Sequence, residues 1–147
     1  MSKRTSIVKA LAEKLKLIDG TGSYKTNIYG AAFPFLKFWD ECNNFPAIYV
    51  VAGGESREYH PSSFTWGYLN VSLKVYTKGE DSQQLLEELL EDIELVINSN
   101  RVLTYDSTNN YETTEILITS ITTDEGLLQP YAVAEVNLQV RYPMQPL

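Results

Sequence analysis

The fold is decided by residues 64–100, FTWGYLNVSLKVYTKGEDSQQLLEELLEDIELVINSN, which combine a long strand, a short turn and an acidic helix. In the strand, apolar residues such as Leu69 and Val71 alternate with polar ones, which is the period of a half-buried antiparallel strand. The apolar residues of the helix fall on one stripe and glutamates cover most of the rest. The stripe consists of Leu85, Leu86, Leu89, Leu90, Ile93 and Val96. This stretch predicts an architecture and contains no catalytic motif.

Outside this stretch the pattern predicts one more helix and four more strands. They are a helix over 5–18, capped by Thr5 or Ser6, and strands over 24–29, 47–51, from 116 to near 124, and 132–141. The resulting order α-β-β-β-α-β-β has few βαβ units. We therefore predict an α+β fold, with a mixed, mainly antiparallel sheet and two helices packed on one face.

Three further local predictions can be compared with the structure. Residues 52–63 are polar and glycine-bearing, so we expect an exposed, mobile connection between two strands. The aromatic residues within 33–45 are expected to cover the first helix, and the alternative is an exposed docking patch. Asp81 and Gln84 have the spacing of a capping box at the start of the acidic helix.

Length and composition predict a single domain over residues 1–147. The chain is 44% hydrophobic and 21% charged, which is typical of an ordinary globular protein. No stretch is apolar for long enough to span a membrane, so we predict synthesis in a cytoplasm and no membrane association. Cys42 is the single cysteine, which excludes an internal disulfide.

The net charge of −7 is distributed unevenly. Residues 1–37 hold seven basic and two acidic side chains, a balance of +5, and residues 38–147 hold five basic and 17 acidic ones, a balance of −12. One basic and one acidic surface are therefore expected. An acidic chain with a pI near 4.7 is a poor candidate for a nucleic-acid-binding protein.

The sequence shows no motif of a catalytic, phosphate-binding or metal site. His60 is the single histidine, and the nearby Ser56 lacks the second glycine of a nucleophile elbow. Gly53 and Gly54 follow an apolar strand, but the Gly-Lys-Ser/Thr ending of a phosphate loop is missing. The acidic helix lacks the histidine of a di-iron motif, so its carboxylates are expected to be solvated. We predict no enzyme, no metal and no cofactor.

Several segments, in their order along the chain, resemble a bacteriophage tail terminator. They are Tyr68–Tyr76, Leu85–Glu94, Ile121–Gly126 and Ala132–Val140. The resemblance implies a structural virion protein that forms a hexameric ring at the head-proximal end of the tail. Its implied partners are the major tail tube protein, a head-completion or neck protein, and DNA that passes through the lumen without specific binding.

The charge asymmetry suggests how such a ring closes, because identical subunits in a ring meet through two different patches. We expect Lys9, Lys14 and Lys16 to lie against Glu87, Glu91 or Glu94 of the next subunit. Arg57, Tyr59 and His60 are further interface candidates, and an acidic lumen would repel DNA. The alternatives are another phage neck or tail connector, a minor tail protein, or a small cytoplasmic adaptor.

Overall fold

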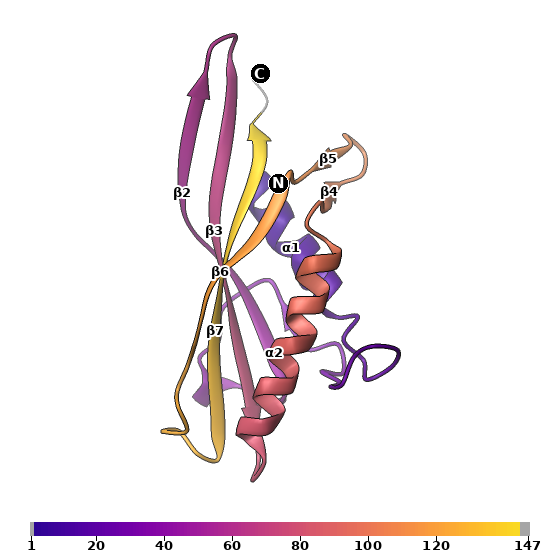
Figure 1. Ribbon diagram of the computed structural model, residues 1–147, viewed down its shortest axis with the longest axis vertical. Coiled ribbons are helices and arrows are strands. Elements are labelled where there is room, and N and C mark those ends of the chain that lie inside the picture. Colours follow the sequence, from indigo (N-terminus) through magenta and orange to yellow (C-terminus); the bar gives the residue numbers. More distant parts are fainter. Residues whose placement is uncertain (1, 145–147) are drawn as a thin grey trace.

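The computed structural model describes residues 2–144, in which two helices lie against one face of a five-stranded sheet (Figure 1). The helices are α1 (Lys3–Leu15) and α2 (Ser82–Ser99), and the sheet consists of β1 (Ala32–Phe33), β2 (Ala47–His60), β3 (Phe64–Lys78), β6 (Glu115–Thr123) and β7 (Tyr131–Met144). Short elements are η1 (Trp39–Glu41) and a separate strand pair, β4 (Thr104–Asp106) with β5 (Tyr111–Glu112).

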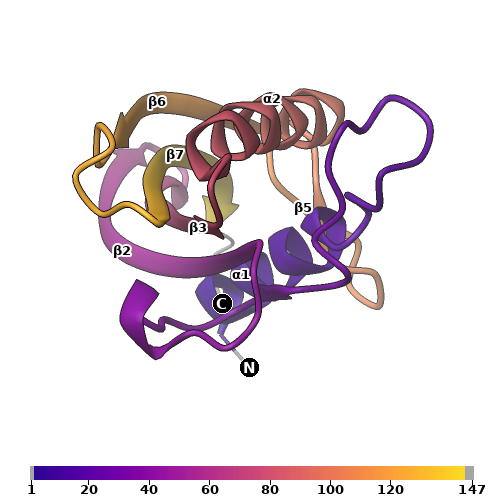
Figure 2. The ribbon, with the colours of Figure 1, turned by 90° about the horizontal axis from the view of Figure 1, so that it is seen from below.

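The strand order is β1-β2-β3-β7-β6. β1 pairs with β2 in parallel, and every other neighbouring pair in this sheet is antiparallel. This confirms the predicted α+β class, the mixed and mainly antiparallel sheet, and the placement of both helices on one face (Figure 2).

The main core lies between this face of the sheet and the two helices. Leu69, Val71, Leu73 and Val75 of β3 are fully buried there, as their alternation predicts. The helices contribute Ile7, Leu11, Leu15, Leu86, Leu89, Leu90, Ile93 and Val96 to the same cluster. Burying this many aliphatic side chains supplies most of the driving force for folding.

Both helix starts differ from the expected ones. The Ser2 hydroxyl accepts a hydrogen bond from the Thr5 amide at 3.1 Å, so α1 begins at Lys3 and the predicted caps Thr5 and Ser6 lie inside it. Asp81 does precede α2, but its side chain makes no capping bond within residues 2–144. The Gln84 amide points to Glu88 instead. The predicted capping box is therefore wrong.

The predicted loop over 52–63 is also wrong, because β2 continues to His60. Glu55 to His60 pair residue by residue with Leu69 to Phe64 of β3, and Gly53 and Gly54 together lie opposite Asn70. The two glycines thus form a β-bulge inside one long strand. This polar segment does not alternate apolar and polar residues. It forms a strand because the long β3 offers backbone hydrogen-bonding partners along its length.

The predicted strand over 24–29 is absent from the described part of the chain, apart from one isolated bridge between Asp19 and Asn27. The backbone amides of Lys25 and Thr26 donate instead to the carboxylate of Asp92, at 2.8 to 3.1 Å. Asp92 is 1% exposed, which corrects the expectation that it is solvated. A buried carboxylate satisfied by backbone donors holds this loop onto α2.

The aromatic segment packs mainly on the opposite face of the sheet, so the expected cover over the first helix is wrong. Phe33, Trp39 and Phe45 surround the buried Tyr49 and Tyr76 in a second, smaller core. In Figure 2 the segment carrying η1 lies on the other side of β2 from α2. Near the end of β3, the aromatic segment covers the sheet face opposite the helices, because Tyr76 provides a large apolar surface there.

Candidate assembly surfaces

The most extended feature is the arm formed by the outer parts of β2 and β3, beyond the Gly53–Gly54 bulge. It projects beyond both helices (Figure 1). The predicted interface residues Arg57, Tyr59 and His60 all lie on it and are exposed, and Tyr59 is 73% exposed. Among described residues, Arg57 pairs with Glu55 and His60 with Glu58, each two positions away. The arm is therefore a two-stranded antiparallel ribbon that exposes these three side chains to solvent.

The two faces of the arm differ. On the helix side, Tyr142 of β7 packs against Gly67, and its hydroxyl donates to Glu55. Burial and this bond raise the pKa of Tyr142 above its ordinary value. On the open side, Arg141 lies over the Trp66 ring at 4.4 Å, a cation–π contact. Side chains of β7 thus contact the arm on both of its faces.

The predicted basic residues of α1 divide between its two flanks. Lys9 belongs with Ser2 and Thr5 on the flank that faces the edge of β2, and Lys16 follows Lys9 by two helical turns on that flank. The Lys16 ammonium already pairs with Glu13 of the same helix at 2.8 Å, an exposed contact. Lys14 belongs to the opposite flank, the flank of Lys3, whose ammonium lies 4.4 Å from the centre of the Tyr111 ring of β5. We name Lys9 and Lys16 the outer basic pair.

The predicted acidic residues of α2 divide in the same way. Glu87 and Glu94 share a flank with Gln83, whose amide donates to Asp124 in the β6–β7 connection. Glu91 is already paired with Lys25 of the same chain at 2.8 Å. We name Glu87 and Glu94 the outer acidic pair; both are exposed and lie on the β6 side of the helix.

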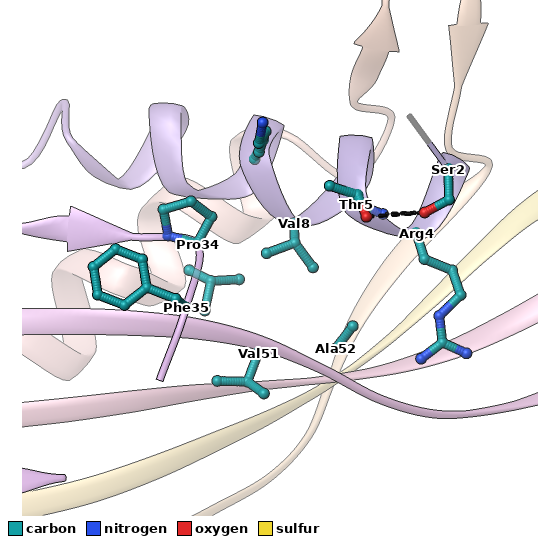
Figure 3. Close-up of a pocket in the computed structure, with 10 residues that line it drawn as sticks. Ser2, Arg4, Thr5, Val8, Pro34, Phe35, Val51 and Ala52 are labelled. Carbon is teal, nitrogen blue, oxygen red and sulfur yellow. Dashed lines mark hydrogen bonds between the residues drawn. The ribbon is translucent and has the colours of Figure 1, made fainter. Parts of the chain in front are cut away.

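An apolar hollow of about 250 Å³ lies at the edge of β2, just beyond the end of β1 (Figure 3). It is lined by Val8 of α1, by Pro34 and Phe35, and by Val51 and Ala52 of β2. Arg4 extends across the same edge and donates to the Gly53 carbonyl. The hollow is shallow and apolar, and it lies next to backbone groups of an edge strand.

The open face of the sheet, opposite the helices, carries a polar network. The Ser72 hydroxyl donates to Asn137 at 3.0 Å, and the Asn137 amide donates to the Ser120 hydroxyl at 3.0 Å. The charged pair at the centre of this face, Lys74 with Glu135, has no net charge. The centre of the open face is therefore polar with little net charge.

The described residues contain no group of three or more side chains arranged to hold a metal ion. In the same part of the chain, neither helix has the length and apolar content that a membrane crossing requires. Sequence reasoning missed Asp92 as an anchor, although an acid next to the apolar stripe of α2 was a usable signal. It also missed the pairing of Glu91 with Lys25, for which the sequence offers no local signal.

Comparison with known proteins gives the family. The family described as Bacteriophage Tail Tube Terminator Protein matches residues 1–147. The tail tube terminator protein of Escherichia phage T5 is 39% identical over 152 residues, covering 97% of this chain and 94% of that protein. A chain in the virion of a native gene transfer agent particle has the same fold, with a TM-score of 0.61 at 9% identity over 94% of this chain and 95% of that one. The chain therefore belongs to the bacteriophage tail tube terminator proteins.

Proposed function

We propose that the protein assembles as a ring, hexameric by family resemblance, on the head-proximal end of a phage tail tube. One ring face binds the last ring of tube protein and stops polymerisation. The other face receives a head-completion or neck protein. Family membership over the whole chain is the observation that carries this proposal, and it indicates a structural rather than an enzymatic role.

The surfaces described above support this proposal. Separate acidic and basic flanks suit the heterologous contact that a closed ring requires. The centre of the open face is polar with little net charge, which suits a lumen through which DNA passes without being held. This replaces the strongly acidic lumen expected from composition, because the exposed acids of α2 lie on the helix side of the sheet.

Tube assembly with purified components tests the proposal. Tail tube protein is polymerised with and without this protein, tube lengths are measured by electron microscopy, and the free protein is examined by native mass spectrometry. Shorter tubes, with the protein at one end only, are expected. An unchanged length distribution with no protein at the tube ends would overturn the proposal.

The same experiment separates the main alternative. A neck connector or adaptor would bind completed tails without changing the length at which tubes stop. A tail that already carries its terminator provides the control, because a true terminator finds no free end there.

A further inference from the structure

Both outer edges of the five-stranded sheet are open. Within residues 2–144, β1 covers only Ile48 and Tyr49 of β2, and β6 pairs on one side only, with β7. The stretch from Val51 to His60 therefore presents unpaired backbone groups on one edge, apart from the Gly53 carbonyl that Arg4 binds. β6 presents them on the other edge. Open edges of this length attract further strands.

The composition of β6 carries little protection against such pairing. Its sequence EILITSITT has one charge, at Glu115, and no lysine or proline, and Leu117 is 41% exposed. Soluble proteins usually place charges or prolines on open edge strands. A bulge at Thr119 is the one protective device on this edge. β-branched, uncharged residues on an open edge indicate that a partner strand covers β6.

The two edges match in strand direction and in the position of their residues along the strands, which we call their level. Through the ladders of β3 and β7, Val50 lies level with Ile121, and Ser56 lies level with Glu115. The chain directions alternate from β2 through β3 and β7 to β6, so β2 and β6 run in opposite directions. When copies stand side by side in the same orientation, β2 of one therefore meets β6 of the next as an antiparallel pair.

The helix layer supplies charges of matching sign at the same two edges. α1 lies over the β2 edge and carries the outer basic pair, Lys9 and Lys16. α2 packs on β6 and carries the outer acidic pair, Glu87 and Glu94. Joining the two edges with the helices on one side places these pairs next to each other. The apolar hollow beside Val51 and Ala52 then faces the level of Ile118 to Ile121 of the neighbour.

We infer that the free edge of β2 in one copy pairs with β6 of the next copy, so that one sheet continues from subunit to subunit. The outer basic pair then lies against the outer acidic pair across each joint. This inference rests on the proposed ring and names the surfaces that close it. It makes the contact heterologous, and repetition of a single joint closes a ring when the rotation from one subunit to the next divides a full turn evenly.

Cysteine cross-linking tests the joint on the full-length protein in a Cys42→Ser background. Val51→Cys and Ser56→Cys on β2 are each combined with Glu115→Cys and Ser120→Cys on β6. Directly opposite residues in an antiparallel pair bring their Cβ atoms to about 5 Å, within reach of a disulfide or a short cross-linker. Leu127→Cys, exposed in the β6–β7 connection, replaces the β6 cysteine in the control.

Antiparallel pairing at matching levels predicts links for Val51 with Ser120 and for Ser56 with Glu115, and a ladder of covalent oligomers without reducing agent. The crossed combinations and the Leu127 control should stay monomeric. Native mass spectrometry of the uncross-linked protein is run in parallel. A ring without edge cross-links would overturn this inference alone, whereas absence of a ring both in the free protein and on tubes would overturn the proposed function.

Discussion

The two halves of β2 belong to one strand but lie in different environments. From Ala47 to Val50 every residue is buried, because the helices cover one face and the aromatic segment covers the other. From Gly53 onward nearly every residue is exposed. The first half is held by packing on both faces, and the second half by its ladder with β3 and by the support of β7.

This difference shows that strand formation and burial are separate properties in this protein. In the covered half, hydrophobic burial specifies both the strand and its register. In the arm, the strand exists because β3 is long and provides hydrogen-bonding partners. Mutations should therefore affect global stability in the covered half and local order or assembly in the arm.

The largest effect is expected for Leu89→Asp, and Ile93→Asp should behave alike. Both side chains are fully buried between α2 and the sheet, so an unpaired carboxylate there should cost about 4 kcal/mol or more. Thermal unfolding measures this, with Glu88→Gln as a control that should change little. An unchanged melting temperature for Leu89→Asp would contradict the assigned core.

Asp92→Asn should destabilise the protein by about 1 to 3 kcal/mol, because it weakens the anchor of the loop at Lys25 on α2. The amide group of asparagine cannot accept all the bonds that the carboxylate receives from Lys25 and Thr26. Denaturant unfolding gives the magnitude, and hydrogen exchange should show faster exchange at residues 25–28 first. The exposed Glu94→Gln is the matched control, and equal effects from both would argue against the anchor.

Gly67→Ala should loosen the arm by about 1 to 3 kcal/mol, because a Cβ at this position would lie 2.8 Å from a Tyr142 ring atom. The ring cannot move freely, since its hydroxyl is bonded to Glu55. Gly54→Ala, where nothing lies within 4 Å of the added Cβ, is the control. Exchange should accelerate in the arm and not in α2. A uniform change across the molecule would weaken the division into two regions.

Alkaline pH should act on stability through buried tyrosines outside the arm. Burial raises the pKa of Tyr76 to about 12 and that of Tyr105 to about 12. In the unfolded chain a tyrosine ionises near pH 10, so the folded state holds more protons between pH 10 and 12. Stability is therefore complete below pH 10 and falls as pH rises through 12.

Tyr76→Phe should reduce that alkaline loss. At neutral pH it should show only a constant offset from the lost hydrogen bond to the Lys37 carbonyl. Denaturant midpoints measured from pH 7 to 12 test this. A slope identical to that of the parent protein would show that Tyr76 does not contribute.

The smallest effect on stability, and the largest on assembly, is expected for Lys9→Glu with Lys16→Glu. Exposed charges contribute about 0 to 1 kcal/mol each, so the subunit should stay folded. Repeated like-charge contacts should impair ring formation or tube capping, and Glu87→Lys with Glu94→Lys should partly restore it. Lys14→Glu, on the opposite flank of α1, should have little effect. Normal capping by the double variant at low salt would contradict the proposed contact between the outer basic pair and the outer acidic pair.

Much of the architecture followed from local pattern. The alternation in β3 and β7 and the stripe on α2 indicated the sheet, its main helix and the core, because burial on one face imposes a period that sequence displays directly. The family resemblance also rested on these segments. The arm, the bulge at Gly53 and Gly54 and the bulge at Thr119 could not be predicted, since each depends on a partner strand distant in sequence.

The sequence by itself determined the α+β class, the two helices, the buried faces of β3 and α2, and the separation of basic from acidic residues along the chain. The tertiary structure alone decided which of those charges lie at the sheet edges. It also buried Asp92 against the loop at Lys25, placed the aromatic segment on the opposite face, and left β2 and β6 open at matching levels. The physical reason is that period and charge are local properties, whereas edges, levels and flanks arise only when distant strands pair.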